Sequence, residues 1–285
     1  MNYELTLIIV VGIYVILSMS LNVIMGFCGQ ISLGHAAFFG AGAYAAAVFA
    51  KSGGSFWYSL TFGALIGGVF GLIIGFASLR VRDDFLAITT MGVGFLFIGV
   101  VRKLEILGGE TGIVGLPDHG LSKLGFAMVV SGLALLVTVL CAYLKRSWAG
   151  YAFSGIAADE DAARTVGIDV SRYKLIAFTI GTACAGLAGA LYAHDTGYVG
   201  VDGFGFVESI TILAMVIVGG IGSVTGVVLA AVLLSVLPLW LQFVADYKLL
   251  LYGALLFLVM RFAPGGIEAM IGQLRRIVYR VSTRR

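Results

Sequence analysis

Long apolar runs constrain this 285-residue chain more than any other feature of its sequence. Hydrophobic residues make up 60% of the chain and charged residues 12%, whereas a soluble domain has about 45–50% apolar and about 25% charged residues. Runs of about 18 or more apolar residues are typical of transmembrane helices. The sequence therefore predicts an all-α polytopic membrane protein. Nine spans are predicted, at residues 5–25, 31–50, 59–79, 85–101, 124–144, 173–193, 207–220, 222–243 and 248–263.

Some predicted spans are shorter than the about 20 residues that cross a bilayer, which favours broken or re-entrant helices at 85–101 and around 219–226. The predicted fold is a compact bundle of about 8–10 transmembrane helices, some of them short. The whole chain, residues 1–285, is interpreted as one transmembrane domain. It carries a polar loop at about 145–172 and a basic C-terminal tail at about 264–285.

Lys and Arg are distributed unevenly between the predicted loops. If the polar loop and the tail face the cytoplasm, 13 of the 18 Lys and Arg residues lie on the cytoplasmic side and five lie outside. This is the asymmetry that positive-inside membrane proteins have. We therefore expect a cytoplasmic C-terminus and, with nine spans, an external N-terminus.

Small residues recur at helical spacing within two of the predicted spans. In lipid, helices associate where small residues let their backbones approach closely. Tight helix packing is the favoured interpretation of these positions, and flexing at a gate is the alternative. The glycines concerned are Gly63, Gly67, Gly71 and Gly75 in the third span, and Gly181 and Gly189 in the sixth.

The sequence offers little for catalysis. No histidine has a second histidine at metal-ligand spacing, and neither a GxSxG nor a GxxxxGK[ST] motif is present. Cys28, Cys141 and Cys184 are far apart in apolar surroundings and are interpreted as buried small side chains. We expect a transport subunit rather than an enzyme, with no metal and no cofactor of its own. An ion- or proton-coupled carrier or channel for small polar solutes is the alternative, although the predicted spans carry almost no ionisable residues.

A dense charged segment, AADEDAARTVGIDVSRYK, occupies residues 157–174 between two apolar runs. Its central part predicts a short helix, because acidic residues suit the positive end of a helix and glycine ends one in the left-handed conformation. Such a helix would form a small cytoplasmic knob that fits a groove of a partner, and a solvated loop is the alternative. The residues predicted to make this contact are Glu160, Asp161, Ala162, Ala163, Arg164 and Gly167.

The motif D-A-A-x-x-x-G at residues 161–167 resembles the Glu-Ala-Ala-x-x-x-Gly motif in the cytoplasmic loop of the permease subunits of ATP-driven (ABC) importers. Further stretches resemble the branched-chain amino acid permeases of that class, over nearly the whole chain. In two places the chain departs from the family pattern: Asp161 replaces Glu, and Asp83-Asp84 replaces Gly-Pro. The similar stretches are GFCGQISLGHAAFFGAGAYAAA (26–47), LRVRDDFLAITTMGVG (79–94), VGIDVSRYKLIAFTIGTACAGLAGALYA (166–193), VGGIGSVTGVVLAA (218–231) and FAPGGI (262–267).

The resemblance is closer to the LivM-type than to the LivH-type subunit, and it implies an importer in a prokaryotic inner membrane. Its partners would be a LivH-type permease, two ATPases that bind ATP and magnesium, and an extracytoplasmic substrate-binding protein, with no nucleic acid. The charged segment would then be the coupling helix that sits in a cleft of an ATPase. The resemblance favours leucine, isoleucine and valine as substrates, while related permeases carry other amino acids, urea, short amides or aromatic acids.

Gln30, Ser32 and His35 are the polar residues of a glycine-rich bend between the first two predicted spans. We expect them near the transport pathway, with hydrogen bonding at a helix end as the alternative.

Overall fold

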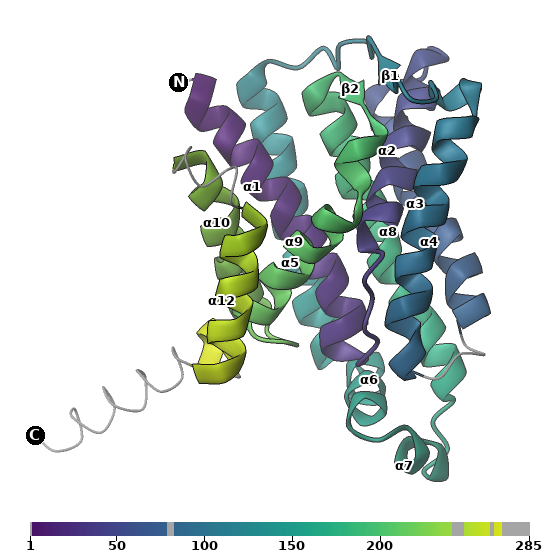
Figure 1. Cartoon of the computed structure of the whole chain (residues 1–285), viewed down its shortest axis with the longest axis vertical. Helices are drawn as coiled ribbons and strands as arrows, with labels where there is room; N and C mark the ends of the chain where they lie inside the picture. Colours follow the sequence, from purple (N-terminus) through teal and green to yellow (C-terminus); the bar gives the residue numbers. More distant parts are fainter. Residues whose placement is uncertain (1, 79–82, 241–247, 263–264, 270–285) are drawn as a thin grey trace, which may run out of the picture.

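The computed structural model describes all residues except 1, 79–82, 241–247, 263–264 and 270–285 (Figure 1). The prediction of an all-α polytopic membrane protein is confirmed, since five helices among these described residues are long and apolar enough to cross a membrane. They are α1 (Asn2–Leu21), which continues into the π-helical turn η1 (Asn22–Phe27), α3 (Phe56–Ser78), α4 (Asp83–Lys103), α5 (Lys123–Arg146) and α8 (Val170–Thr196).

Four shorter helices complete the described part of the bundle. They are α2 (His35–Lys51), α9 (Phe206–Gly219), α10 (Val224–Trp240) and α12 (Lys248–Phe262). At about 1.5 Å per residue, the 14 residues of α9 span about 21 Å, which is less than the about 30 Å of a bilayer core.

Two of the predicted spans differ in character from the structure: one begins later than expected and one is continuous. The span predicted at 31–50 begins only at His35, because residues 28–34 are not helical. The span at 85–101, expected to be broken, is the continuous 21-residue helix α4. The break expected around 219–226 is confirmed: α9 ends at Gly219, and α10 begins at Val224 after a turn at residues 220–223.

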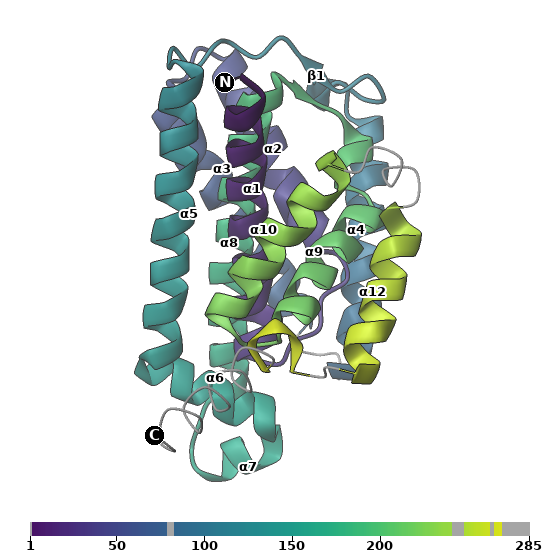
Figure 2. The ribbon, with the colours of Figure 1, turned by 90° about the vertical axis from the view of Figure 1, so that its left-hand side faces the viewer.

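Short elements lie at the two ends of the bundle. The helices α6 (Trp148–Ala158) and α7 (Glu160–Thr165) lie together at one end, here called the α7 end. The N-terminus of α1 lies at the opposite end in both ribbon views (Figures 1 and 2). That end also carries the two-stranded sheet of β1 (Ile113–Val114) and β2 (Tyr198–Val199), with the short helices η2 (Glu105–Leu107) and η3 (Val201–Phe204) in the adjoining connections.

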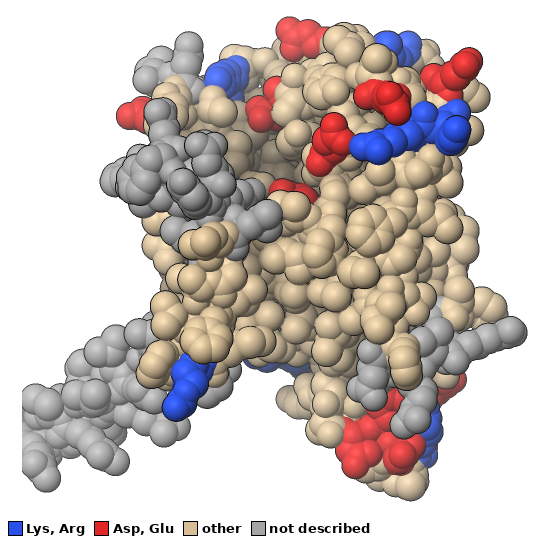
Figure 3. Space-filling view, in the orientation of Figure 1, with Lys and Arg blue, Asp and Glu red and all other residues tan. Residues whose placement is uncertain are grey.

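Charge separates the ends from the middle of the molecule. On the face in Figure 3, Lys, Arg, Asp and Glu gather at the two ends, and a broad band of uncharged residues lies between them. This is the surface that a membrane-spanning bundle requires, because ionisable groups in the hydrocarbon are costly. The free cysteines Cys28, Cys141 and Cys184 are buried, as predicted. Most of the predicted tail at 264–285 lies outside the described residues.

The most extensive helix packing in the described structure joins α2, α3 and α8. A methyl group added at Gly63 would lie 2.8 Å from Ala190 Cβ, and one added at Gly67 would lie 2.8 Å from Gly186 Cα. Gly42 of α2 also lies against Gly186, so the three backbones meet almost without side chains between them.

The remaining predicted glycines also lie at helix contacts. Gly71 faces the Thr182 side chain, and Gly75 faces Leu175 and Phe178, all on α8. From α8, Gly181 lies against Ile24 of η1, and Gly189 lies against the Phe39 carbonyl of α2.

Candidate functional site

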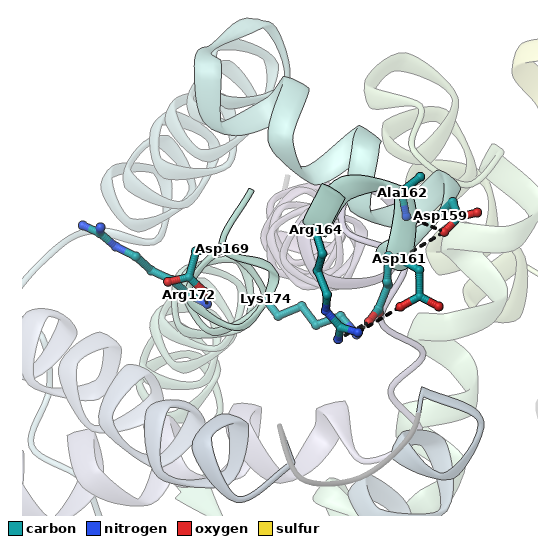
Figure 4. Close-up of polar contacts among 8 residues, drawn as sticks. Asp159, Asp161, Ala162, Arg164, Asp169, Arg172 and Lys174 are labelled. Atoms are coloured by element: carbon teal, nitrogen blue, oxygen red, sulfur yellow. Dashed lines mark hydrogen bonds and ion pairs between the residues drawn. The ribbon is translucent and has the colours of Figure 1, made fainter. Parts of the chain in front are cut away.

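The charged segment forms a short capped helix at the α7 end (Figure 4). The Asp159 carboxylate accepts hydrogen bonds from the backbone amides of Asp161 (2.9 Å) and Ala162 (3.0 Å), which makes Asp159 the N-cap of α7. Glu160 and Asp161 occupy the first turn, where negative charge favours the helix.

Gly167 ends this helix in a left-handed conformation, with φ of +87°. The Gly167 amide donates to the Arg164 carbonyl (3.0 Å), and the Ile168 amide donates to the Ala163 carbonyl (3.1 Å), which is a Schellman arrangement. Ala163 is buried under the helix, whereas Ala162 is exposed. Capping at both ends explains how six residues hold a helical turn.

An ion pair joins α7 to the start of α8, and two more lie within α7. Arg164 contacts Asp161 at 3.0 Å and Glu160 at 3.4 Å, and Lys174 of α8 forms an ion pair with Glu160 (Figure 4). The Lys174 side chain is only 10% exposed, so this ion pair lies largely out of contact with solvent. Asp161 remains exposed. The structure thus brings all six predicted residues of the segment together.

The end of α6 touches the non-helical stretch at residues 28–34. A methyl group added at Gly29 would lie 3.1 Å from Ala157 Cα, in the last turn of α6 before the N-cap of α7. Gly29 has φ of +78°, which other residues rarely adopt. The backbone of the stretch therefore rests directly on the segment that carries α7.

Asn22 holds the turn between α9 and α10. Its Nδ2 group donates to the Ser223 carbonyl (2.8 Å), and its Oδ1 atom accepts from the Gly222 amide (2.9 Å). Lys145, near the end of α5, donates to the Gly222 carbonyl (2.8 Å). Asn22 is fully buried, so the α9–α10 turn is bound to η1 by a desolvated amide and to α5 by a charged side chain.

The predicted pathway residues Gln30, Ser32 and His35 are all buried. Ser20 Oγ donates to the Leu17 carbonyl (2.6 Å) and contacts His35 Nε2 (2.7 Å). Because a hydroxyl has one hydrogen, the donor and acceptor roles of Ser20 Oγ and His35 Nε2 follow from the histidine tautomer. Among the described residues, no group pairs with Gln30 Oε1, Ser32 Oγ or His35 Nδ1. These atoms remain available to water or to a polar solute.

The first turns of α2 and α9 meet inside the bundle. The Ala36 amide donates to Ser209 Oγ (3.0 Å), and the Leu33 amide donates to Thr90 Oγ1 of α4 (3.0 Å). The cavity between Leu33, Phe206 and α4 has a volume of about 10 Å³. A single water molecule needs about 10–15 Å³, so this cavity has room for about one water molecule.

Sequence reasoning missed Asn22, Lys145 and the contact of Gly29 with Ala157. Asn22 could have been recognised from the sequence, because it is a lone amide inside an otherwise apolar run. Polar residues within membrane spans are rare and often functional. The other two contacts join segments far apart in the chain, and no local pattern marks them.

The amino-acid sequence matches a known protein family. The family described as "Branched-chain amino acid transport system / permease component" matches residues 4–260. The chain is 36% identical to the high-affinity branched-chain amino acid transport system permease protein LivM of Escherichia coli (strain K12), over 90% of this chain and 68% of that protein. It is 26% identical to a probable LivM of Methanocaldococcus jannaschii, over 72% of this chain and 65% of that protein.

The LivH permease of Salmonella typhimurium is 30% identical over 49% of this chain and 45% of its own length. No solved structure matches the chain. The match of the family over residues 4–260, together with the apolar helical bundle, shows that this chain belongs to the permease components of branched-chain amino acid transport systems.

Proposed function

We propose that this chain is one of two permease subunits of an ATP-driven importer for branched-chain amino acids in a prokaryotic inner membrane. A LivH-type permease, two ATPases and an extracytoplasmic binding protein would complete the assembly. The names of the LivM and LivH relatives support this proposal. The α7 end would face the cytoplasm, in keeping with the distribution of Lys and Arg, and the N-terminus of α1 would lie outside.

The observation that carries the proposal is the position of α7. This capped helix lies at one end of the bundle, with exposed acidic and apolar side chains, and its neighbours reach the two places where helices are interrupted. Movement of α7 by an ATPase would pass to α8 through Glu160 and Lys174. It would pass to residues 28–34 through Ala157 and Gly29. ATP and magnesium would be bound on the ATPase chains.

The pathway would run along residues 28–34. Interrupted helices at membrane depth supply solute sites in other transporters, because their backbone and polar side chains can replace water around the solute. Gln30, Ser32 and His35 have buried atoms that lack partners among the described residues, which supports this placement. Leucine, isoleucine and valine are the proposed solutes on the strength of the relatives' names.

The test is Gly167→Val in the complete transporter, reconstituted in proteoliposomes with its binding protein. Valine is strained by about 1–2 kcal/mol at the positive φ of Gly167, so the end of α7 should be displaced. We expect ATP hydrolysis that the loaded binding protein no longer stimulates, and loss of leucine uptake. Gly197→Val is the matched control, because Gly197 has φ of +63°, has equally open surroundings and lies at the opposite end of α8.

Normal uptake and normal stimulation in Gly167→Val would remove α7 from the coupling role. The reversal Asp161→Lys changes the charge on the surface of α7, because this side chain is 91% exposed. Uptake of leucine without the ATPases, driven by an ion gradient, would instead identify a carrier and contradict the whole proposal.

A further inference from the structure

We infer that the face of the bundle between α4 and α12 is the surface that packs against the second permease subunit. This inference rests on the proposed two-permease importer and adds which side of this chain meets the partner. The surface is here called the seam face, and it consists of residues 28–34, the first turn of α9 and the outward side of α4. It faces the viewer in Figure 1.

Non-helical backbone on the seam face is the first argument. Leu33 lies against Thr90, which is seven residues into α4, so the stretch reaches about 10 Å up from the lower end of that helix. Ile31 is 45% exposed there. The backbone amides of Ile31 and Ser32 donate to no other described residue. Lipid offers no hydrogen bonds, so non-helical backbone at this depth must be covered by protein or must line water.

Exposed apolar side chains on the same face are the second argument. Phe95 of α4 and Phe206 of α9 stack with ring centroids 6.3 Å apart, and both remain substantially exposed. Val207 and Ile31 are exposed nearby. A wholly aqueous channel would leave this apolar surface in water, which the hydrophobic effect opposes. A second protein chain covers the apolar groups and leaves room for solute along the polar ones.

The glycines of α4 are the third argument. A methyl group added at Gly92 or Gly99 would meet no atom within 4 Å, in contrast to Gly63 and Gly67 in the packed core. Both glycines lie on the exposed side of α4, seven residues apart, and leave room for another helix to approach its backbone. A LivH-type permease is the occupant that fits, because it is a helical membrane protein of the same family.

Site-specific photo-cross-linking in the intact transporter in its native membrane tests the seam face. A benzophenone amino acid replaces Leu96 on α4, which is 64% exposed, or Leu136 on α5, which is 58% exposed on the opposite side of the bundle. We expect a covalent product with the LivH-type subunit from position 96 and only lipid adducts from position 136. Lipid adducts alone from position 96, or a product with a second copy of this chain, would overturn the inference.

A second variant pair measures assembly without cross-linking. Gly92→Trp places a large side chain on the seam face, and Gly132→Trp places it on α5, where a methyl group likewise meets no atom within 4 Å. We expect Gly92→Trp to lower co-purification of the LivH-type subunit by about tenfold, a change that corresponds to ~1.4 kcal/mol. Gly132→Trp should leave it unchanged. Equal recovery from both variants would overturn the inference.

The controls separate this inference from the proposed function. If the wild-type complex takes up leucine with ATP but Leu96 yields only lipid adducts, the seam face is wrong and the importer stands. If no second permease or ATPase co-purifies with the wild-type chain, the proposed function itself fails.

Discussion

The close contact between α3 and α8 predicts that one methyl group added at Gly67 lowers the free energy of unfolding by a measurable amount. In Gly67→Ala, the new Cβ would lie 2.8 Å from Gly186 Cα and 2.8 Å from the Thr182 carbonyl. Ordinary van der Waals contact begins at 3.4 Å, so the two helices must separate by about 0.6 Å or more. Overpacking of this kind lowers the free energy of unfolding by about 1–3 kcal/mol. Neither neighbour can rotate away, because both contacts are with backbone atoms.

Gly132→Ala isolates this cost from the intrinsic helix preference of alanine. Gly132 lies in the middle of α5, and a methyl group there meets no atom within 4 Å. Replacement of glycine by alanine in a helix stabilises by about 0.5–1 kcal/mol, and this gain applies to both variants. The difference between the two free energies of unfolding should therefore be about 1–3 kcal/mol, with Gly67→Ala the less stable.

The assay is equilibrium unfolding of the full chain in mild-detergent micelles titrated with sodium dodecyl sulfate, followed by circular dichroism. Both variants are compared with the wild-type chain in the same titration. If Gly67→Ala and Gly132→Ala have the same free energy of unfolding, or if Gly67→Ala is the more stable, the direct backbone contact of α3 with α8 is refuted.

Three further predictions concern the α7 end. Asn22→Leu leaves the half-buried Gly222 amide and the buried Ser223 carbonyl without the Asn22 side chain, and it should lower the free energy of unfolding by about 1–4 kcal/mol in the same titration. A loss no larger than that of Thr138→Ala, whose hydrogen bond stays within its own helix, would contradict the role of Asn22 in holding the α9–α10 turn. Asp159→Ala removes the N-cap of α7, which stabilises the helix by about 1 kcal/mol. Hydrogen exchange of the backbone amides of residues 160–165 should therefore become about fivefold faster. Unchanged exchange would show that the cap contributes nothing to the stability of α7. Gly29→Val should destabilise more than Gly53→Val, because both glycines have positive φ but only Gly29 contacts Ala157; equal losses would argue against that contact.

The sequence predicted those elements that are fixed by residues close to one another in the chain. α7 is an example, since its N-cap Asp159 and its terminal Gly167 lie within nine residues of each other. The long helices were also predictable, because a bilayer leaves the backbone few alternatives. The same constraint explains why α4 is continuous, although the shortness of the predicted span favoured a break. In lipid, an interrupted helix would lose hydrogen bonds that nothing nearby replaces.

A bend between the first two spans was predicted, but hydropathy placed residues 31–34 inside the second span, whereas the non-helical stretch covers residues 28–34. Its backbone is held by partners in other elements, such as the Ile24 carbonyl, which accepts from Gln30, and Thr90, which accepts from Leu33. The hydrogen bonds of Asn22 likewise depend on a turn 200 residues later in the chain. Such long-range contacts place the candidate site, and composition and spacing carry no information about them.

The contact of three backbones at Gly42, Gly67 and Gly186 has a mechanical consequence. Helices that touch through their main chains have no layer of flexible side chains to absorb sliding, so α2, α3 and α8 should travel as one stiff unit. Any alternation between outward and inward openings must then come from displacement of the remaining helices around that unit. Displacement of α8 by α7 would therefore carry α2 and α3 with it, relative to the remaining helices.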